Sequence, residues 1–291
     1  MLEKVTDRIY YMMHDDENDR PALGIVVGDN CCLIVDSGNS PKHAEDLKKE
    51  LNSMNLPEVK YLVITHHHWD HTFGLGEWGV TTIANQRTYE YMKTYCGLSY
   101  DDLALEEAKR KQIFKDFSIK CIKKEIENLE AFQPQNCNLT FEGELWIDLG
   151  GISCCIRQVP SPHTDDSTIV YVPDEQTLFL GDCLYGYNSK GYNYYNRELV
   201  RQMIDTLEQY TAKYYLCSHE SICTREEISD FWQQLNMGAD ITKHSDSLDA
   251  AIAEYQKLYG SEPKEDELFF IKSFGVGDGW GRIGELKPEI F

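Results

Sequence analysis

Residues 65–71 read Thr-His-His-His-Trp-Asp-His and place four candidate metal ligands within six positions. His66 and His68 are two residues apart, so in an extended segment their side chains point the same way and can bind one ion. Asp70 and His71 come where the chain begins to turn, and they can face a second ion. Imidazole and carboxylate together suit zinc. A merely polar loop is the alternative, and this density of ligand types disfavours it.

Three further candidate ligands lie downstream, each just after an apolar run that is typical of a buried strand. They are His163 after 152–159 (ISCCIRQV), Asp182 after 176–181 (QTLFLG) and His219 after 214–218 (YYLCS), while the first cluster follows 60–65 (KYLVIT). Alone, a His or Asp in such a place is more often a turn residue or a cap. Because ligands at strand ends can gather at one edge of a sheet, we expect all of them to meet there.

Strand and helix patterns alternate along the whole chain, which predicts the α/β class with helices packed outside sheets. Further strands are expected at 21–27, 31–36, 81–85, 139–149 and 167–172, and helices at 41–52, 197–210, 225–237 and 247–259. Residues 86–132 are rich in Glu, Lys, Leu and Tyr and follow a helical pattern. We expect one domain over 1–291 that ends in a tail at 261–291.

The ordered motifs H-x-H-x-D-H, S-P-H-T, L-G-D and S-H resemble those of the metallo-β-lactamase superfamily, and 34–38 (IVDSG) is similar to its strand-ending V-D-x-G. The resemblance covers roughly residues 20–220. It implies an αβ/βα four-layer sandwich with the metals at one edge, and a dinuclear hydrolase of the glyoxalase II or lactonase-like branch.

The resemblance also implies a role for each residue. His66, His68 and His163 would hold one metal, Asp70, His71 and His219 the other, and Asp182 would bridge both, while Asp36 would brace the ligand loop. Tyr185 stands three residues after Asp182, as in relatives that open lactones, where the phenol donates a hydrogen bond to the substrate. A tyrosine is unremarkable in this chain, which has 18 of them.

The implied cofactors are two Zn²⁺ ions, with Fe or Mn as alternatives. Coordination lowers the pKa of water from about 15.7 towards ~7, so a metal-bridging hydroxide can attack a substrate carbonyl at neutral pH. Asp70 would orient this nucleophile or move a proton to the leaving group. The two ions with Asp70, Asp182 and one hydroxide leave about one positive charge, which favours a neutral carbonyl or an anionic substrate group.

The predicted function is hydrolysis of an ester, thioester or lactone of a small molecule. Phosphodiesterase and β-lactamase activities stay open. The β-lactamase alternative is weakened because the best-known enzymes of that kind carry Cys at the bridging position, whereas here Asp182 stands there and Cys183 should point away. The remaining alternatives are an iron-dependent oxidoreductase on the same scaffold and a non-catalytic binding protein. The complete set of ligands argues against both.

The charge of the chain argues against polyanionic partners. There are 28 Lys and Arg against 49 Asp and Glu, a formal net charge of −21, so we expect neither nucleic acid nor an anionic membrane surface to bind. The first residues carry no signal-peptide pattern. The ten cysteines have no C-x-x-C spacing and lie mostly in apolar stretches, which is typical of buried thiols in a reducing cytosol, and we expect a cytoplasmic location.

Three segments remain open in their role. The aromatic stretch 186–196 (GYNSKGYNYYN) is expected to be a loop, either a pocket wall or a surface turn. Relative to compact members of this superfamily, the helical segment 86–132 is an insertion, which either covers the pocket, forms a structural hairpin or contacts a second subunit. The Gly-rich stretch 274–284 matches a phosphate loop only weakly and better suits a capping arm or a homodimer contact.

Overall fold

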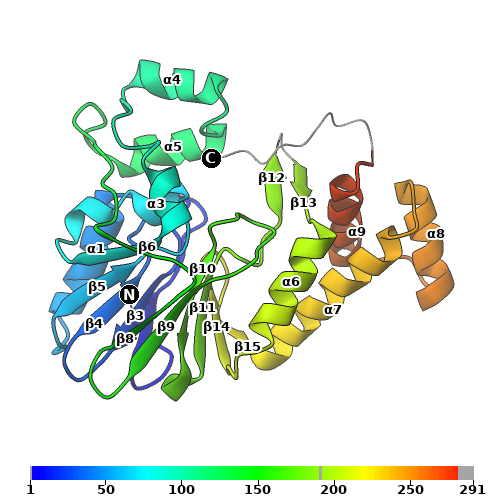
Figure 1. Ribbon diagram of the computed structural model, residues 1–291. Coiled ribbons are helices and arrows are strands. Elements are labelled where there is room, and N and C mark those ends of the chain that lie inside the picture. The colour runs from blue at the N-terminus through cyan, green and yellow to red at the C-terminus, as the bar shows by residue number, and fades with distance from the viewer. Residues whose placement is uncertain (1, 190–191, 281–291) are drawn as a thin grey trace.

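Two β-sheets face each other and helices cover both outer faces (Figure 1). The computed structural model describes residues 2–189 and 192–280. One sheet has the order β1-β2-β3-β4-β5-β6-β7 and the other the order β15-β14-β11-β10-β9-β8. This arrangement confirms the predicted α/β class and the αβ/βα four-layer sandwich.

The strands of the first sheet are β1 (Leu2–Lys4), β2 (Ile9–Met12), β3 (Leu23–Val27), β4 (Cys32–Val35), β5 (Val59–Val63), β6 (Thr81–Asn85) and β7 (Leu139–Phe141). Those of the second are β8 (Glu144–Asp148), β9 (Ser153–Gln158), β10 (Thr168–Val172), β11 (Thr177–Gly181), β14 (Tyr214–Cys217) and β15 (Cys223–Thr224). A separate hairpin consists of β12 (Tyr187–Ser189) and β13 (Tyr192–Tyr194).

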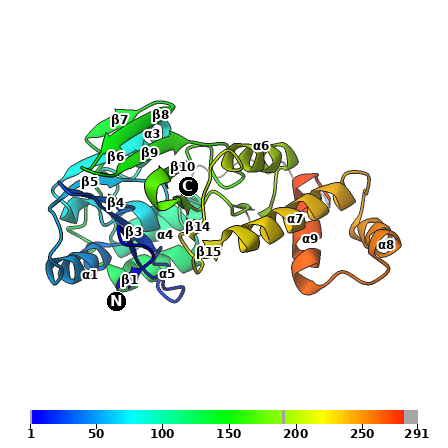
Figure 2. The same cartoon turned by 90° about the horizontal axis from the view of Figure 1, so that it is seen from below.

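The helices beside the first sheet are α1 (Pro41–Asn52), α2 (Trp69–Thr72), α3 (Gln86–Met92), α4 (Asp102–Arg110) and α5 (Asp116–Glu125). Beside the second sheet lie α6 (Arg197–Leu207) and α7 (Arg225–Thr242), and α8 (Leu248–Tyr259) and α9 (Glu265–Gly277) pack against α7. Short 3₁₀ turns lie at Leu75–Glu77 and Pro173–Glu175. Seen from below, α8 lies farthest from the sheets (Figure 2).

Strand β4 shows how one apolar run serves two layers. All four of its residues are buried, and successive side chains point to opposite faces. Leu33 packs between the sheets with residues of the second sheet, including Val170 and Phe179, whereas Ile34 packs on the outer face against Leu47 of α1. A strand buried on both faces needs this unbroken apolar pattern.

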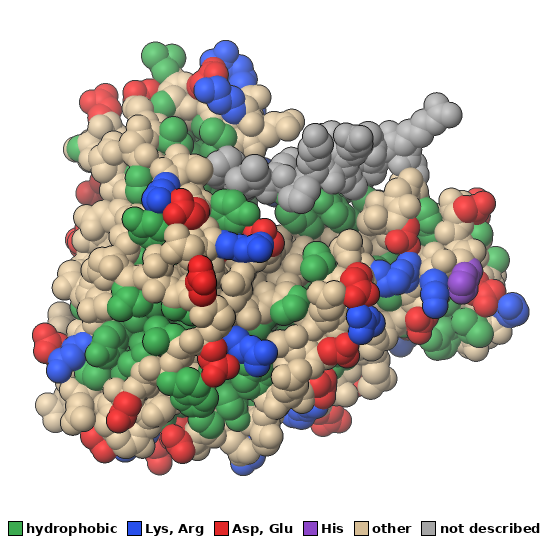
Figure 3. All heavy atoms as spheres, viewed as in Figure 1, with side chains coloured by type: hydrophobic (Ala, Val, Ile, Leu, Met, Phe, Trp, Pro, Cys, Tyr) green, Lys and Arg blue, Asp and Glu red, His purple; other side chains and the backbone are tan. Residues whose placement is uncertain are grey.

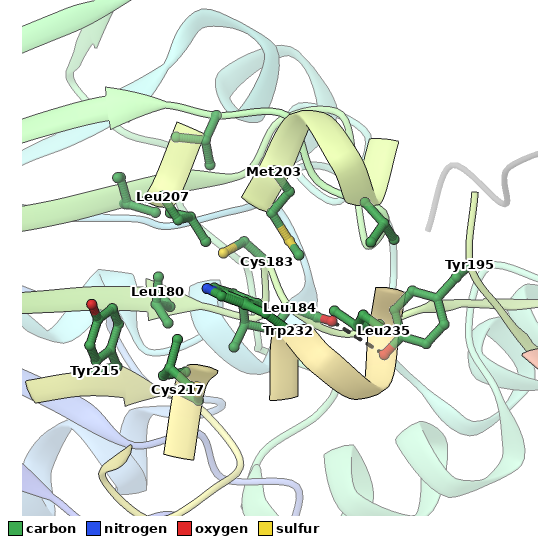
Figure 4. Packing of buried hydrophobic residues seen from close by; sticks show 14 of the residues in the cluster. Leu180, Cys183, Leu184, Tyr195, Met203, Leu207, Tyr215, Cys217, Trp232 and Leu235 are labelled. Atoms are coloured by element: carbon green, nitrogen blue, oxygen red, sulfur yellow. Dashed lines mark hydrogen bonds between the residues drawn. The ribbon is translucent and has the colours of Figure 1, made fainter. Parts of the chain in front are cut away.

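The outer face of the second sheet packs against α6 and α7. Leu180 and Tyr215 of the sheet contact a cluster that includes Met203 and Trp232 (Figure 4). Cys183 belongs to the same cluster and is fully buried there, so its thiol points away from the histidine cluster, as predicted.

The predicted helical insertion forms α3, α4 and α5 between β6 and β7. The insertion packs in a small aromatic core with Phe73. The ring centroid of Phe73 lies 5.6 Å from that of Tyr95 and 5.4 Å from that of Tyr100. The helices α4 and α5 lie on the same side of the sandwich as the β12–β13 hairpin (Figure 1).

Two expectations differ from the structure. The run 139–149, expected as one strand, is divided between the sheets, because the left-handed Gly143 (φ +69°) turns the chain from β7 to β8. The stretch 186–196, expected as a loop, contains the β12–β13 hairpin. Helix α9 lies within the predicted tail and contains the start of the Gly-rich stretch, of which residues 281–284 fall outside the described part.

None of the helices among the described residues combines the length and apolar character of a transmembrane span. All ten cysteines are unpaired, and eight of them are buried, which agrees with their predicted role as small apolar side chains. On the face shown in Figure 3, basic side chains stand among acidic ones instead of forming a continuous stripe.

Candidate metal centre

The first group of candidate ligands joins three histidines from two loops. His66 and His68 follow β5, and His163 lies in the β9–β10 loop. The Nε2 atom of His66 lies 3.0 Å from Nδ1 of His68, and Nε2 of His163 lies 3.1 Å from the same Nδ1 atom. Three ring nitrogens thus converge on one point.

The second group lies beside the first. Asp70 and His71 are in the short helix α2, and His219 is in the β14–β15 turn. Oδ2 of Asp70 lies 3.1 Å from Nε2 of His71 and 3.2 Å from Nε2 of His219. Asp70 and His71 are buried, at 6% and 0% exposure of the whole residue.

Asp182 lies between the two groups: its Oδ2 faces the first group and also lies 3.7 Å from Nε2 of His219, and its Oδ1 faces His71. Its Oδ2 is 3.5 Å from Nε2 of His163, and its Oδ1 is 3.5 Å from Nε2 of His71. Gly181, the last residue of β11, has a φ of +55°, and a Cβ there would lie 2.7 Å from Oγ1 of Thr65. The absence of a side chain therefore lets β11 approach the end of β5 closely enough to bring Asp182 to the histidines.

The geometry fits two metal ions. The candidate ligand atoms in each group all lie within 4.8 Å of one another. A tetrahedral zinc with bonds of ~2.1 Å separates its ligand atoms by about 3.4 Å, close to the distances found. Nε2 of His71 and Oδ1 of Asp182 are buried without a hydrogen-bond partner, and a buried polar atom of this kind calls for a ligand. The His and Asp clusters are suitable for a dinuclear metal site.

A sequence profile of the metallo-β-lactamase superfamily matches residues 22–219, which contain both groups. The chain belongs to the metallo-β-lactamase superfamily. The superfamily predicted from the motifs is thereby confirmed. Its members are mostly hydrolases.

Solved structures with the same fold include a metallo-β-lactamase from Pontibacter korlensis, with a TM-score of 0.53 and 17% identity over 80% of this chain and 97% of that one. The sec-alkylsulfatase Pisa1 from Pseudomonas sp. gives a TM-score of 0.62 and 13% identity over 92% of this chain and 47% of that one. A curated protein of Aspergillus versicolor named "Putative transcription factor avaE" is 20% identical over 242 residues, which are 76% of this chain and 67% of that one. At these identities the two structural similarities establish the metallo-β-lactamase fold alone.

Burial sets the protonation states that suit metal binding. Burial and the neighbouring imidazoles lower the pKa of His66 and of His68, which keeps these rings neutral and able to bind a metal. For His71 burial acts in the same direction, but Asp70 and Asp36 outweigh it and raise its pKa. Without metals, a proton on His71 takes the place of a cation among these carboxylates.

Asp36 braces the ligand loop, as predicted. Its carboxylate accepts hydrogen bonds from the Thr65 amide (2.8 Å), the Thr65 hydroxyl (2.9 Å) and Nδ1 of His71 (2.8 Å). The last bond puts the His71 proton on Nδ1 and leaves Nε2 free to bind metal. Asp36 has a φ of +65°, a conformation rare for a residue with a side chain.

A second buried carboxylate, Asp166, also holds the ligand loop, and the sequence analysis did not predict it. His67, between the two ligand histidines, points the other way, and its backbone amide (2.9 Å) and Nδ1 (3.0 Å) bond to the buried Asp166. The Thr88 hydroxyl also donates to Asp166 (2.8 Å). This carboxylate ties the loop of His66 and His68 to the loop of His163. The alternation of side-chain directions along 66–68 indicates that His67 points away from the ligands. Its partner Asp166 lies 99 residues away, so the local sequence does not reveal it.

Tyr185 lies at the edge of the centre. Its hydroxyl accepts a hydrogen bond from the His219 amide (3.2 Å), and its ring centroid is 6.1 Å from that of His163. Burial and the nearby Cys217 and Asp182 raise the pKa of Tyr185 well above its usual range, so the phenol keeps a proton that it can donate.

Two pockets adjoin the centre. One, of about 290 Å³, is lined by Asp70, His163, Asp182 and His219, and by residues of the insertion. The other, of about 760 Å³, also reaches His163 and has a largely apolar wall that includes Val159, Pro160, Pro162 and Leu199. Tyr187 of β12 also lines it, so the hairpin forms part of a pocket wall.

Proposed function

We propose that this chain is a zinc-dependent hydrolase that cleaves an ester, thioester or lactone bond of a small molecule. The observation that carries the proposal is the position of Asp182, whose two oxygens face two separate groups of ligand atoms. Such an arrangement supports a pair of ions that share one carboxylate. Two divalent ions held by these residues would supply an activated water and polarise a substrate oxygen.

The residues of the chain would divide the remaining work. His66, His68 and His163 would hold one ion, Asp70, His71 and His219 the other, and Asp182 both. Asp70 lies in the pocket wall, from which its carboxylate can orient the attacking water or pass a proton to the leaving group. Tyr185 can donate its phenol proton to the substrate oxygen, since its own hydroxyl already accepts from the His219 amide.

Zinc is the metal that best suits this ligand set. Three histidines and one carboxylate make up the first group, and two histidines and two carboxylates the second; imidazole with few carboxylates favours zinc over the hard cations. Manganese prefers more oxygen ligands. Iron also accepts imidazole and carboxylate, so iron-dependent redox chemistry is the second candidate, and analysis of the bound metal separates the two.

The pockets favour a compact substrate with an apolar part. The scissile group would lie in the pocket of about 290 Å³ at the ligand atoms, and the apolar part would extend into the pocket lined by Val159, Pro162 and Leu199. A panel of lactones, thioesters and aryl esters therefore comes first. A phosphodiester, a β-lactam and a secondary alkyl sulfate complete it, the last two because of the named activities of the structural relatives.

The test is metal content by elemental mass spectrometry on protein grown with both zinc and iron, alongside activity on the panel. Wild type should hold about two zinc ions per chain, and Asp182→Ala should lose metal and activity together. Asp174→Ala, in the turn between β10 and β11 of the same sheet, is the matched control and should keep both. Iron in place of zinc would favour the redox enzyme. Failure to bind any metal after reconstitution would refute the dinuclear centre, and zinc-loaded protein inert on the whole panel would refute the hydrolase.

A further inference from the structure

Asp19 is an acidic residue in the pocket of the metal centre that the mechanism above does not use. It lies in the β2–β3 loop, far in sequence from the ligands, and lines the pocket of about 290 Å³ together with Asp70, Asp182 and His219. Its φ of +53° is left-handed. A non-glycine residue in this conformation costs about 1 kcal/mol or more and often marks a functional position.

Buried hydrogen bonds and ion pairs hold the backbone around Asp19 in place. Nδ2 of the buried Asn39 donates to the carbonyl of Asn18 (2.8 Å) and to that of Asp19 itself (3.2 Å). The next residue, Arg20, pairs with the buried Glu125 of α5 at 2.6 Å and with Asp46 of α1 at 3.1 Å. The loop is thus fixed to both α1 and the insertion, and Asp19 is held at the pocket.

Within residues 2–189 and 192–280 the carboxylate of Asp19 makes no hydrogen bond or salt bridge, although the charges of His219 and His71 act on it. Burial and the nearby Asp70 and Asp182 raise its pKa to about 7, whereas His219 and His71 lower it. A half-buried carboxylate without a partner is unfavourable unless something binds to it.

Aromatic rings make up much of the rest of this pocket. Trp69 comes from the ligand loop, Tyr95 from the segment after α3, Phe114 from the segment before α5, and Phe117 from the first turn of α5. The faces of aromatic rings attract cations, most strongly where water is excluded, and cages of aromatic rings recognise quaternary ammonium groups. A carboxylate beside an aromatic wall suits an organic cation better than a neutral or anionic group.

The net charge of the centre, with Asp19 included, is also compatible with an organic cation. The ions with Asp70, Asp182 and one hydroxide leave about one positive charge, and Asp19 cancels it. The expected preference for an anionic group therefore does not extend to this pocket. Lys115 lines the same pocket but donates to the Asn188 carbonyl at the hairpin (3.2 Å), and the strongly acidic chain attracts cations from solution.

We propose that Asp19 and the aromatic wall bind an alkylammonium group of the substrate and so select cationic esters, thioesters or lactones. The proposal builds on the proposed hydrolase, because it places the cation in the same pocket as the scissile bond. Its occupant is an amine or quaternary ammonium joined to the acyl or alcohol part by a short chain.

Two isosteric probes test the binding site without requiring catalysis. Choline and 3,3-dimethylbutan-1-ol differ only in whether nitrogen or carbon carries the three methyl groups. Their affinities for zinc-loaded protein are to be measured by NMR titration on wild type, on Asp19→Asn and on Asp16→Asn. Asparagine tolerates the left-handed backbone, so Asp19→Asn should remain folded. Asp16→Asn makes the same charge change at an exposed position of the same loop.

Wild type and Asp16→Asn should bind choline about tenfold or more tightly than the neutral alcohol, and Asp19→Asn should lose the preference. Equal affinities in wild type, or a preference that survives Asp19→Asn, would overturn the proposal.

Hydrolysis of p-nitrophenyl butanoate and p-nitrophenyl 3-aminopropanoate separates this proposal from the proposed function. Both esters should be cleaved by wild type, with KM lower for the amino ester, and Asp19→Asn should raise KM for that ester alone. Cleavage of both without such a preference would refute the cation site and leave the hydrolase standing. Asp19-dependent choline binding without hydrolysis of either ester would support the cation site and refute the hydrolase.

Discussion

Asp36→Asn is the substitution that most directly tests how the fold prepares the metal centre. Asparagine keeps the shape of the side chain and tolerates the φ of +65°. The substitution replaces one carboxylate oxygen by an amide nitrogen, which can donate hydrogen bonds but cannot accept them. Since Asp36 accepts from the Thr65 amide, the Thr65 hydroxyl and Nδ1 of His71, one donor must face another donor in either orientation of the amide.

The size of the effect follows from those bonds. If the amide faces Thr65, one backbone N–H is left buried without an acceptor, and if it faces His71, the ring is driven towards the tautomer with its proton on the metal-binding Nε2. A lost hydrogen bond to a charged group costs about 1.5–3 kcal/mol. We therefore expect the free energy of unfolding of the metal-free protein to fall by about 2–4 kcal/mol. Loss of a residue that orients a metal ligand weakens metal binding by about 10–100-fold.

The assay combines urea unfolding of metal-free protein with zinc titration against a chromophoric chelator. Because Asp36 supports His71, the ion held by Asp70, His71 and His219 should be weakened more than its neighbour. Asp29→Asn is the control: this carboxylate pairs with Arg8 at the surface (2.7 Å) and should change neither quantity appreciably. Zinc affinities within twofold of wild type, with unchanged unfolding, would refute the bracing role of Asp36.

Three further substitutions test other parts of the structure. Tyr185→Phe should keep its zinc but lower kcat/KM on the preferred ester about tenfold or more, and steady-state kinetics showing no loss would remove the phenol from the mechanism. Glu125→Gln leaves Arg20 without its buried partner and should reduce stability towards urea by about 3 kcal/mol, whereas an unchanged midpoint would show that the pair does not hold the loop. Gly181→Ala brings a Cβ within 2.7 Å of the Thr65 hydroxyl at a φ of +55°. The free energy of unfolding should fall by at least ~1–2 kcal/mol, and the zinc content should fall with it. Normal zinc content would show that the close approach of β11 to β5 is not needed to place Asp182.

The sequence predicted most of the fold because its strands are buried on both sides. Runs such as 31–36 and 60–65 are continuous and apolar, and the turn residues between them are clear. Helix α1 was predicted with the boundaries that the structure shows, because Ser40 caps its first turn and Pro41 begins it.

The strand prediction was wrong where the alternating sequence pattern continued although the chain passed from one sheet to the other. Within 139–149 the strand-like alternation runs across Gly143, and only pairing with distant strands decides that β7 joins one sheet and β8 the other. The first two strands, β1 and β2, are three and four residues long, and segments this short carry little periodic signal.

The candidate ligands could be predicted because each follows a strand, and strand ends meet at one edge of the sandwich. His163, Asp182 and His219 are brought to His66 by that rule alone. Asp19 follows no such rule. It reaches the pocket through contacts of its loop with Asn39 and of its neighbour Arg20 with Glu125, which lie 20 and 105 residues away, and no local pattern encodes those pairings.

Buried polar atoms of the candidate metal centre lack hydrogen-bond partners, and this connects metal binding with stability. Asp36, Asp70, Asp166 and Asp182 are all buried at this edge, and buried carboxylates require counter-charges. Asp36 and Asp166 obtain hydrogen bonds from histidines and threonines. Asp70 and Asp182 instead share His71 and His219, with one oxygen of Asp182 left unpaired. Cations in the two groups would supply the missing charge, so part of the free energy of metal binding becomes free energy of folding.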